Sequence, residues 1–416
     1  MFYMEKINKC CNEMIRTIMK WPFFLLSITT VALCACDDED TPAPLTPTPT
    51  DNVARMITDK DKLAMIYSLT DLEGDKGRIY EMTYNVDYKL EDALDFEIDC
   101  TNRLKLFVAQ HLMDAIPSTS EGINLSFDAG CSVYACPDKS GENFMGRNFD
   151  FNHLDPNTKE RIMIPVIAVH TAPVGGKKSV SFVDGQFLDY KSGFYTDGTS
   201  DLSMLMALPY VLLDGINEDG FAVSVLKLDG LYTHQQEADK KSIFTTIAMR
   251  MLLDKAGSVK EAVELLKKYN MRMDKVAASY HFFMADAKGD YAIVEYTNAD
   301  TSKNPDKMEI LSGNDTLRCV TNFYVSPTMA TTPHGIHQSD HGKKRYEILR
   351  ETLLKNNYKM NSSQGMELLK QVSQGPENPE LSTGFTQWSE VYNLNKKKVT
   401  MSILREFDKK FTFVVN

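Results

Sequence analysis

Three side chains within one short stretch of the 416-residue chain have the chemistry of a nucleophilic enzyme. Cys131 supplies a thiol, Arg147 follows it by 16 positions and Asp150 by 19. The alternation of Ser132–Cys136 predicts a strand, and the turn-forming residues Asp138–Gly141 predict that the chain doubles back as a hairpin. The hairpin would bring a nucleophile, a fixed positive charge and an orienting acid to one end of a two-stranded unit.

Cys131 needs a nearby cation if it is to act as a nucleophile. The thiolate is the reactive form, and the pKa of an unperturbed cysteine, about 8.5, has to be lowered to populate it at neutral pH. Arg147 is the candidate cation, although Arg147 and Asp150 could also be a surface ion pair. Cys131 could instead be a core thiol or form a disulfide with Cys136, but residues five apart on a strand face opposite sides, so that disulfide is poorly placed. Three cysteines are expected to be buried thiols: Cys100, Cys136 and Cys319.

The pattern from Cys131 to the run Gly-Arg-Asn-Phe-Asp, which ends at Asp150, resembles the N-terminal-nucleophile (Ntn) cysteine hydrolases. This family includes the choloylglycine hydrolases (bile salt hydrolase and penicillin V acylase), acid ceramidase and N-acylethanolamine acid amidase. The resemblance extends from about Tyr80 to the C-terminus. It implies an α+β fold, an Ntn-hydrolase four-layer αββα sandwich, with residues 131–416 as the catalytic domain. Residues 56–130 resemble the N-terminal helical pro-segment or small subunit of acid ceramidase and its amidase relative.

The resemblance also supplies the general base. None of the eight histidines has a spacing that marks it as the partner of Cys131. In the family the base is the α-amino group of the cysteine itself, which titrates at about 7.7–8.0. Cys131 is internal, so the resemblance implies a precursor that cleaves its own Gly130–Cys131 bond. The thiol would then attack an amide carbonyl and form an acyl-enzyme, from which water releases the acid.

The remaining roles are carried over by resemblance. Asp150 would hold the new α-amine, and Arg147 would lie beside the thiol. Asn322, in Val-Thr-Asn, matches the second asparagine of the family, an amide donor to the oxyanion, although a lone asparagine at a strand end is also a common turn former. Arg345, in Lys-Lys-Arg-Tyr, matches the late arginine of the family, although a basic run is usually a helix face in solvent.

One position departs from the pattern of the family. Bile salt hydrolases have an oxyanion asparagine ten residues after the asparagine of an Asn-Glu-x-Gly loop. Counting from Asn217 of this chain reaches Lys227. The expected donor is therefore replaced or comes from a backbone N–H, which argues against bile-salt specificity more than against amide hydrolysis.

Residues 1–36 are predicted to be a lipoprotein signal peptide. The apolar run Trp21–Leu33 follows basic residues and is shorter than the roughly 20 residues that span a bilayer. It leads into Leu-Cys-Ala-Cys, which resembles a bacterial lipobox and implies acylation of Cys36. A plain membrane anchor and a secretory signal cut elsewhere are the alternatives.

Residues 37–55 are predicted to be a tether between the lipid and the folded domain, because acidic and proline-rich sequence stays extended. The acidic run at 37–40 resembles the surface-export signals of some diderm bacteria, or is simply a solvated charge run. We therefore expect a lipid-anchored protein of the bacterial cell envelope, in the outer membrane, with surface exposure left open.

The overall composition narrows the classes of protein to which the chain can belong. With 43% hydrophobic and 25% charged residues, the chain has an ordinary globular composition. The net charge of -11 argues against nucleic acid as a partner. Eight cysteines are too few for a disulfide scaffold in a chain of this length. A homo-oligomeric state is compatible with this composition.

Hydrophobic periodicity predicts strands, then helices, then strands, which fits a layered α+β body. Strands are expected over Phe221–Leu228 and Leu317–Val325, for example, and helices over Lys343–Leu354 and Ser363–Gln374. In the predicted pro-segment, helical spacing covers two stretches: Lys60–Leu72 and Leu90–Ile116. The apolar run Met204–Leu213 is expected to be core more than an acyl-chain pocket.

No metal or organic cofactor is implied. Four residues have the spacing of zinc ligands: His334, His337, Asp340 and His341. Their segment, Met329–His341, is rich in proline, threonine and glycine, so a loop at the rim of the substrate cleft is the favoured interpretation over a zinc site.

These inferences predict a hydrolase of linear amide C–N bonds that releases a hydrophobic acyl acid from an amine. N-acyl lipids or amino-acid conjugates lead as small-molecule substrates, and conjugated bile salts and penicillin V follow. Acyl transfer is also open, because an amine can intercept an acyl-enzyme. The contrasting hypothesis is a non-catalytic surface lipoprotein that keeps the fold to bind a ligand.

Overall fold

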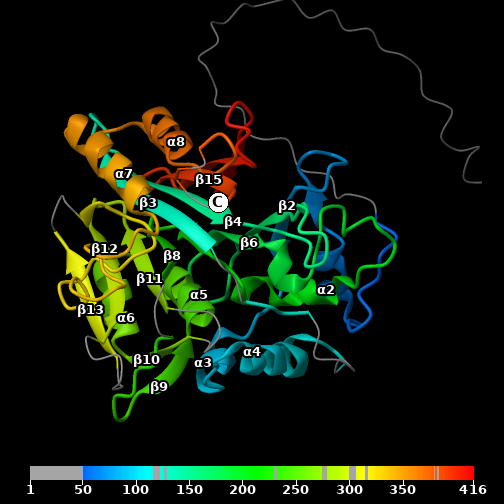
Figure 1. Ribbon diagram of the computed structural model, residues 1–416. Coiled ribbons are helices and arrows are strands. Elements are labelled where there is room, and N and C mark those ends of the chain that lie inside the picture. Colours follow the sequence, from blue (N-terminus) through cyan, green and yellow to red (C-terminus); the bar gives the residue numbers. More distant parts are fainter. Residues whose placement is uncertain are drawn as a thin grey trace, which may run out of the picture. The chain divides into compact units, whose positions relative to one another are not determined.

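The computed structural model describes residues 50–115, 122–125, 129–228, 232–273, 279–298, 306–313, 317–378, 380–381 and 384–416 (Figure 1). The predicted signal peptide with Cys36 and most of the predicted tether lie outside these residues. Within the described part of the chain, no helix has the length and apolar character needed to cross a membrane.

Two large β-sheets form the centre of the fold. Among the described residues the first sheet has nine strands, which pair in this order: β1 (Thr70–Asp71), β2 (Ile79–Tyr84), β5 (Val166–Thr171), β6 (Ser179–Asp184), β7 (Asp214–Asn217), β8 (Ala222–Leu228), β11 (Ser279–Ala285), β12 (Tyr291–Thr297) and β13 (Lys307–Ser312). The second has six over the same residues: β14 (Cys319–Val320), β3 (Ala129–Pro137), β4 (Asn143–Phe151), β15 (Thr386–Asn393), β16 (Lys398–Ile403) and β17 (Phe411–Val414). A short parallel pair joins β9 (Lys241–Phe244) to β10 (Tyr269–Arg272).

Helices cover the outer face of each sheet, as Figure 1 shows. α7 (Lys343–Lys355) and α8 (Ser362–Gln371) pack on the six-stranded sheet, and α5 (Thr245–Lys255) and α6 (Val259–Leu266) on the nine-stranded sheet. A capping box between Asn361 and Gln364 fixes the start of α8. The predicted four-layer αββα sandwich is therefore confirmed.

Strands β3 and β4 are buried almost throughout because both faces of their sheet are covered. The core between the two sheets takes the inward side chains of the hairpin, while a second cluster fills the space under α7 and α8. Asp138 closes the turn, since its Oδ1 accepts hydrogen bonds from the amides of Ser140 and Glu142, and Gly141 has a φ of +93° that favours glycine. The hairpin is formed where the sequence predicts it.

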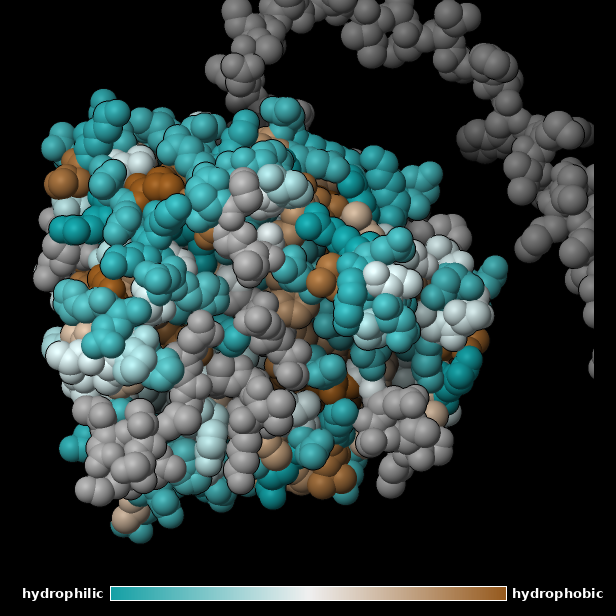
Figure 2. Space-filling model, in the orientation of Figure 1, coloured by the Kyte–Doolittle hydropathy of each residue, from teal (hydrophilic) through white to brown (hydrophobic). Residues whose placement is uncertain are grey.

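The remaining short helices are α2 (Lys60–Ile66), α3 (Leu90–Asp95), α4 (Thr101–Phe107), the π-helical turn η1 (Val108–Leu112), and the 3₁₀ segments η2 (Gly185–Leu188) and η3 (Leu202–Tyr210). Every residue of segment η3 except the partly buried Met204 is buried, so this part of the predicted core run is core. In the space-filling view of Figure 2, the coloured residues of this face are mainly hydrophilic with scattered apolar ones, as expected when most apolar side chains lie inside.

The predicted pro-segment is not purely helical. α2 ends at Ile66, and Thr70 already belongs to β1, so the helix expected over Lys60–Leu72 is shorter than predicted. Strand β2 pairs in parallel with β5 and is rich in residues that favour strands. The search for apolar residues at helical spacing did not detect this strand. The end of the predicted tether also lies on the folded body, where Asn52 is buried and its Nδ2 donates to Phe194 O at 2.6 Å. The predicted pro-segment thus supplies two strands, β1 and β2, to the nine-stranded sheet.

We expect Met82→Ala in β2 to lower the free energy of unfolding by about 2–5 kcal/mol, because it leaves a cavity in a packed core. Met82 is 1% exposed, whereas its neighbour Thr83 is exposed. The matched variant Thr83→Ala should change stability by no more than about 0.5 kcal/mol. Urea unfolding of both variants checks this. Equal effects would show that β2 does not have its inner face in the core.

Candidate active site

The register of β3 and β4 places the predicted catalytic residues. Phe149 pairs with Cys131, and Asp150 pairs with Gly130. Because side chains alternate along a strand, Cys131 and Arg147 face the core between the sheets, whereas Asp150 lies on the opposite face of β4. The thiol and the acid of the predicted trio therefore act from opposite faces of one hairpin.

Arg147 lies beside the thiol and is fixed by the nine-stranded sheet. Its Nη2 is 3.7 Å from Cys131 Sγ and donates to Val225 O of β8 at 3.0 Å. Its Nη1 forms an ion pair with the carboxylate of Asp214 on β7. Both partners of this ion pair are fully buried, so Arg147 is not part of a surface ion pair. The guanidinium is thus held in a fixed place against the Cys131 thiol.

The backbone of Cys131 is held from the other side by Arg345 and Asn322. Arg345, on α7, donates from Nη1 to Cys131 O at 2.5 Å and to Ser132 Oγ at 2.9 Å. Its Nη2 donates to Asn322 Oδ1 at 2.8 Å, and the same oxygen accepts the amide of Cys131 at 2.8 Å. Arg345 is fully buried, so it is not part of a solvated helix face.

Asn322 follows β14, which is shorter than the predicted strand Leu317–Val325. Its Nδ2 donates to Lys227 O at 2.8 Å. Lys227, the residue that departs from the family pattern, therefore contributes its backbone carbonyl to the site. Asn322 now holds the amide of Cys131 through its oxygen, while the nitrogen that is the expected oxyanion donor bonds to β8.

Asp150 is buried among hydrogen-bond donors. Gln374 Nε2 donates to its Oδ2 at 2.8 Å, Thr386 Oγ1 donates to its Oδ1 at 2.5 Å, and Arg345 Nη1 lies 3.7 Å from its Oδ2. Burial raises the pKa of Asp150 to about 6, and the charge of Arg345 opposes this shift. Gln374 also explains why residue 130, just before Cys131, is a glycine. A Cβ at this position would collide with Gln374 Nε2.

The thiol of Cys131 is closed to solvent in the intact chain, with 1% of the residue exposed. Burial raises the pKa of Cys131, and the Arg147 guanidinium only partly opposes this effect. The protonated thiol is therefore the dominant form at neutral pH while the Gly130–Cys131 bond is intact.

Several residues of the site escaped the sequence analysis. Asp214 lies in a turn-rich run, and its role depends on a contact between sheets. His281 and Glu295 form a buried pair at 3.0 Å beside the site. The ring Nε2 of His281 bonds to Thr321 O at 2.9 Å, and the Glu295 carboxylate accepts the amides of Val325 and Ser326 at 2.9 and 3.0 Å. This pair fixes the chain on both sides of Asn322, and the long sequence separations left no local signal for it.

The other candidate residues lie apart from the nucleophile. Among the described residues no group of three His, Cys, Asp or Glu side chains is arranged to hold a metal ion, so the spacing of His334, His337, Asp340 and His341 does not translate into such a site. Cys136 and Cys319 are buried thiols in the cluster under α7 and α8, as predicted, whereas Cys100 is only partly buried.

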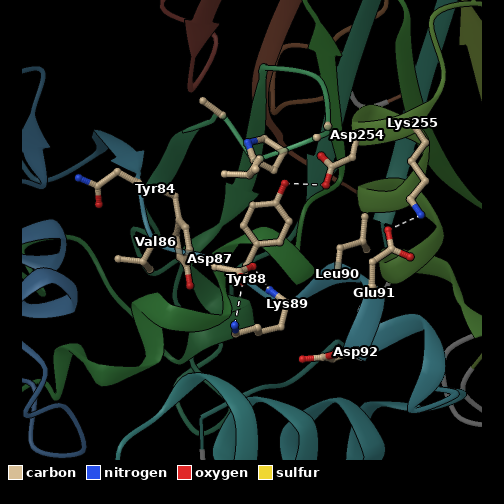
Figure 3. Close-up of a pocket in the computed structure, with 16 residues that line it drawn as sticks. Tyr84, Val86, Asp87, Tyr88, Lys89, Leu90, Glu91, Asp92, Asp254 and Lys255 are labelled. Carbon is tan, nitrogen blue, oxygen red and sulfur yellow. Dashed lines mark hydrogen bonds and ion pairs between the residues drawn. The ribbon is translucent and has the colours of Figure 1, made fainter.

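A cavity of about 390 Å³ shares no lining residue with the Cys131 cluster. Figure 3 shows the residues that line it. It lies along Tyr84–Asp92, and its back wall carries Asp254, which accepts a hydrogen bond from the Tyr88 hydroxyl at 2.6 Å. At its rim Lys255 pairs with Glu91 at 2.5 Å. The cavity therefore does not belong to the site around Cys131.

Comparison with known proteins gives the family. A family model described as acyl-coenzyme A:6-aminopenicillanic acid acyl-transferase matches residues 136–405. The chain belongs to this family. The matched range begins five residues after Cys131 and includes the other four predicted catalytic residues: Arg147, Asp150, Asn322 and Arg345. The predicted kinship with the Ntn amide hydrolases is thereby confirmed.

Two solved structures are among those that the chain matches. A mutant of conjugated bile acid hydrolase from Clostridium perfringens is 15% identical, with a TM-score of 0.46, over 69% of this chain and 92% of that chain. Penicillin V acylase from Agrobacterium tumefaciens is 18% identical, with a TM-score of 0.42, over 66% of this chain and 83% of that chain. No curated protein matched the sequence.

The raised pKa of Asp150 predicts a pH dependence of stability. The folded protein holds the Asp150 proton more tightly than the unfolded chain, so this contribution to stability is present at low pH and is lost as the pH rises through about 6. In a Cys131→Ala background, the stability of the parent relative to Asp150→Asn should fall by about 2 kcal/mol between pH 4 and pH 7. Denaturant titrations across this range measure the difference.

Asp138 provides the control, because hydrogen bonds from the turn, that of the Ser140 side chain above all, hold its pKa below the usual range. The stability of the parent relative to Asp138→Asn should therefore move in the opposite direction, being lost as the pH falls. A constant difference for Asp150→Asn across the range would contradict the assignment.

Proposed function

We propose that the protein is an Ntn amide hydrolase that becomes active when its Gly130–Cys131 bond is cut. The proposal rests on one observation: buried polar side chains bind both the thiol and the backbone of Cys131. Arg147 lies at the thiol of Cys131, while Arg345 and Asn322 bind its backbone carbonyl and amide. A merely structural cysteine needs neither of the two buried arginines nor the asparagine.

The cut is proposed to be made by Cys131 itself. The thiol adds to the carbonyl carbon of Gly130, the C–N bond breaks, and the thiol proton passes to the leaving amine. Water then cleaves the thioester, which leaves a carboxyl group on Gly130 and a free thiol and α-amine on Cys131. Asn322 Oδ1 already accepts the Cys131 amide and is placed to hold the new amine. The segment before Gly130 would remain bound, because it supplies β1 and β2 to the nine-stranded sheet.

The same groups support the proposed turnover. The α-amine takes the proton of Cys131 Sγ, and the thiolate, beside Arg147, adds to the substrate carbonyl. The proton then goes to the leaving amine, and water, deprotonated by the α-amine, releases the acid. Asn322 Nδ2 is the proposed oxyanion donor, so its present acceptor, Lys227 O, would have to be exchanged for the oxyanion.

The proposed substrate is a linear amide of a hydrophobic acyl group, either an N-acyl lipid or an amino-acid conjugate. The long segment before Cys131 and the lysine at position 227 favour these over conjugated bile salts and penicillin V. Acyl transfer to a second amine is the other candidate, because the family model is named for an acyl-transferase. In both cases the thioester on Cys131 is the common intermediate. If neither reaction occurs, the remaining hypothesis is a ligand-binding lipoprotein with the same fold.

The first test is the intact mass and N-terminal sequence of the purified protein. We expect wild type to give a fragment that begins at Cys131, and Cys131→Ala to stay whole because it lacks the attacking thiol. Cys136→Ala is the matched control, since Cys136 lies on the same strand but faces the cluster under α7 and α8. Cleavage of Cys131→Ala would point to another protease, and full amidase activity in an uncut wild-type chain would exclude the α-amine as base.

We also propose that Cys36 is acylated and anchors the protein to the outer membrane of a bacterial cell envelope, because the short apolar run and the small-residue junction support a lipoprotein signal. Cys36→Ser should move the protein from the membrane fraction to the soluble fraction and abolish incorporation of a labelled fatty acid. Cys34→Ser, two residues earlier, should leave both unchanged. Retention of the label in Cys36→Ser would contradict the assignment.

A further inference from the structure

Glu390 is a buried carboxyl group on the far side of Arg147 from the thiol. It lies on β15, where it pairs directly with Arg147 of β4, and it is fully buried. Side chains of directly opposed residues project from the same face of a sheet, so Glu390 faces the core between the sheets, as Cys131 does. Within the described part of the chain, Glu390 Oε2 and Arg147 Nε have no hydrogen-bond partner. An acceptor and a donor thus lie buried on neighbouring strands.

The charges around Arg147 are not balanced. The guanidinium is in direct contact with the carboxylate of Asp214, which already neutralises it. Glu390 supplies a second carboxyl group to the same cation, in a region without solvent. A second buried carboxylate beside one cation favours its protonated form. Burial accordingly raises the pKa of Glu390 to about 7, with the charge of Arg147 opposing the shift.

The other groups that face Glu390 do not offset a second negative charge. On its own strand, Trp388 Nε1 donates to Oε1 at 3.3 Å, and the Tyr392 hydroxyl, which donates to Asp214 Oδ1 at 3.1 Å, is nearby. On β16 the opposed residue is Met401, which carries no charge. On β3 the nearest titratable group is Cys131 itself, across Arg147.

The second buried arginine lies elsewhere. Arg345 approaches Cys131 from α7, on the face of the six-stranded sheet opposite to Glu390, and its carboxylate neighbour is Asp150. Arg147 is therefore the cation that the Cys131 thiolate and the Glu390 carboxylate have in common.

We propose that Glu390 is a positioning residue that controls how strongly Arg147 stabilises the Cys131 thiolate. This inference rests on the proposed function of the same site. Protonated Glu390 leaves the guanidinium to Asp214 and the thiolate. Ionised Glu390 competes for the same charge, so the thiol becomes harder to deprotonate. The nucleophile is then most acidic on the acid side of the Glu390 titration, and the enzyme has a built-in pH limit.

The test is the rate at which iodoacetamide alkylates Cys131 from pH 5 to pH 10, read by mass spectrometry on the peptide that contains Cys131. Glutamine has the shape of the protonated glutamate, so Glu390→Gln should match wild type below about pH 6 and react severalfold faster above pH 7.5. The apparent pKa of the thiol should fall by about half a unit to one unit. Ser389→Ala, the neighbour that faces away from the site, should follow the wild-type profile throughout.

Two results would overturn the proposal. Identical profiles would show that Glu390 does not act on the thiol, and a constant offset at every pH would show a purely structural effect. If Glu390→Gln does not fold, the profile of Asp150→Asn decides, because Asp150 also titrates near Cys131, with a pKa of about 6. The proposal requires a second titrating group to persist in that variant, and a single-group fit contradicts it. The same mass spectra show whether the Gly130–Cys131 bond is cut. An uncut chain would count against the proposed function alone. Cys131 is 1% exposed in that form, so its ionisation would be followed by the ultraviolet absorbance of the thiolate that Cys131→Ala removes, and Glu390→Gln would again have to lower the apparent pKa of the thiol relative to wild type.

Discussion

The buried charge of Arg147 is the constraint on which the rest of the site depends. A guanidinium buried between two β-sheets needs a partner of opposite charge and acceptors for its donors. For Arg147, on the six-stranded sheet, the nine-stranded sheet supplies the Asp214 carboxylate at Nη1 and Val225 O at Nη2. The contact joins the two central layers directly beneath Cys131. The position of the cation is therefore set by the packing of the whole sandwich.

The hairpin separates two tasks by using both of its faces. The inner face carries the Cys131 thiol and the Arg147 guanidinium, which lies 3.7 Å from it. On the outer face, Arg345 of α7 and Asn322 bind the backbone carbonyl and amide of Cys131, and Asp150 of β4 lies beside Arg345. Because β-strand side chains alternate, one residue can meet both sets without crowding. This division explains why two buried arginines surround a single cysteine.

The local parts of this arrangement could be predicted from the sequence, and the distant parts could not. The hairpin from Cys131 to Asp150 follows from alternation and turn chemistry, and its register brings Arg147 to the thiol. Asn322 and Arg345 were reached only through a family resemblance, since a strand-end asparagine and a basic run carry no signal of their own. Asp214 and Glu390 depend on which strands become neighbours across and between sheets, a relation that no local pattern encodes. Strand β2 was missed because helical spacing dominated its surroundings.

The intact chain is a closed state of the site. Cys131 is buried, burial raises the pKa of its thiol, and its amide is engaged with Asn322. Cleavage would add an α-amine and open a chain end at the nucleophile, so one event would supply both the base and the access that the intact form lacks. In the proposed mechanism, the contacts that keep the intact chain closed would also orient Cys131 after cleavage.

The most direct measurement of this account is mass spectrometry of the protein during reaction with an N-acyl amide of a long-chain acid. The account predicts a transient mass increase equal to the acyl group, confined to the fragment that begins at Cys131 and absent from any uncut chain. An acyl adduct on another residue, or product release from a chain that still carries the Gly130–Cys131 bond, would contradict it.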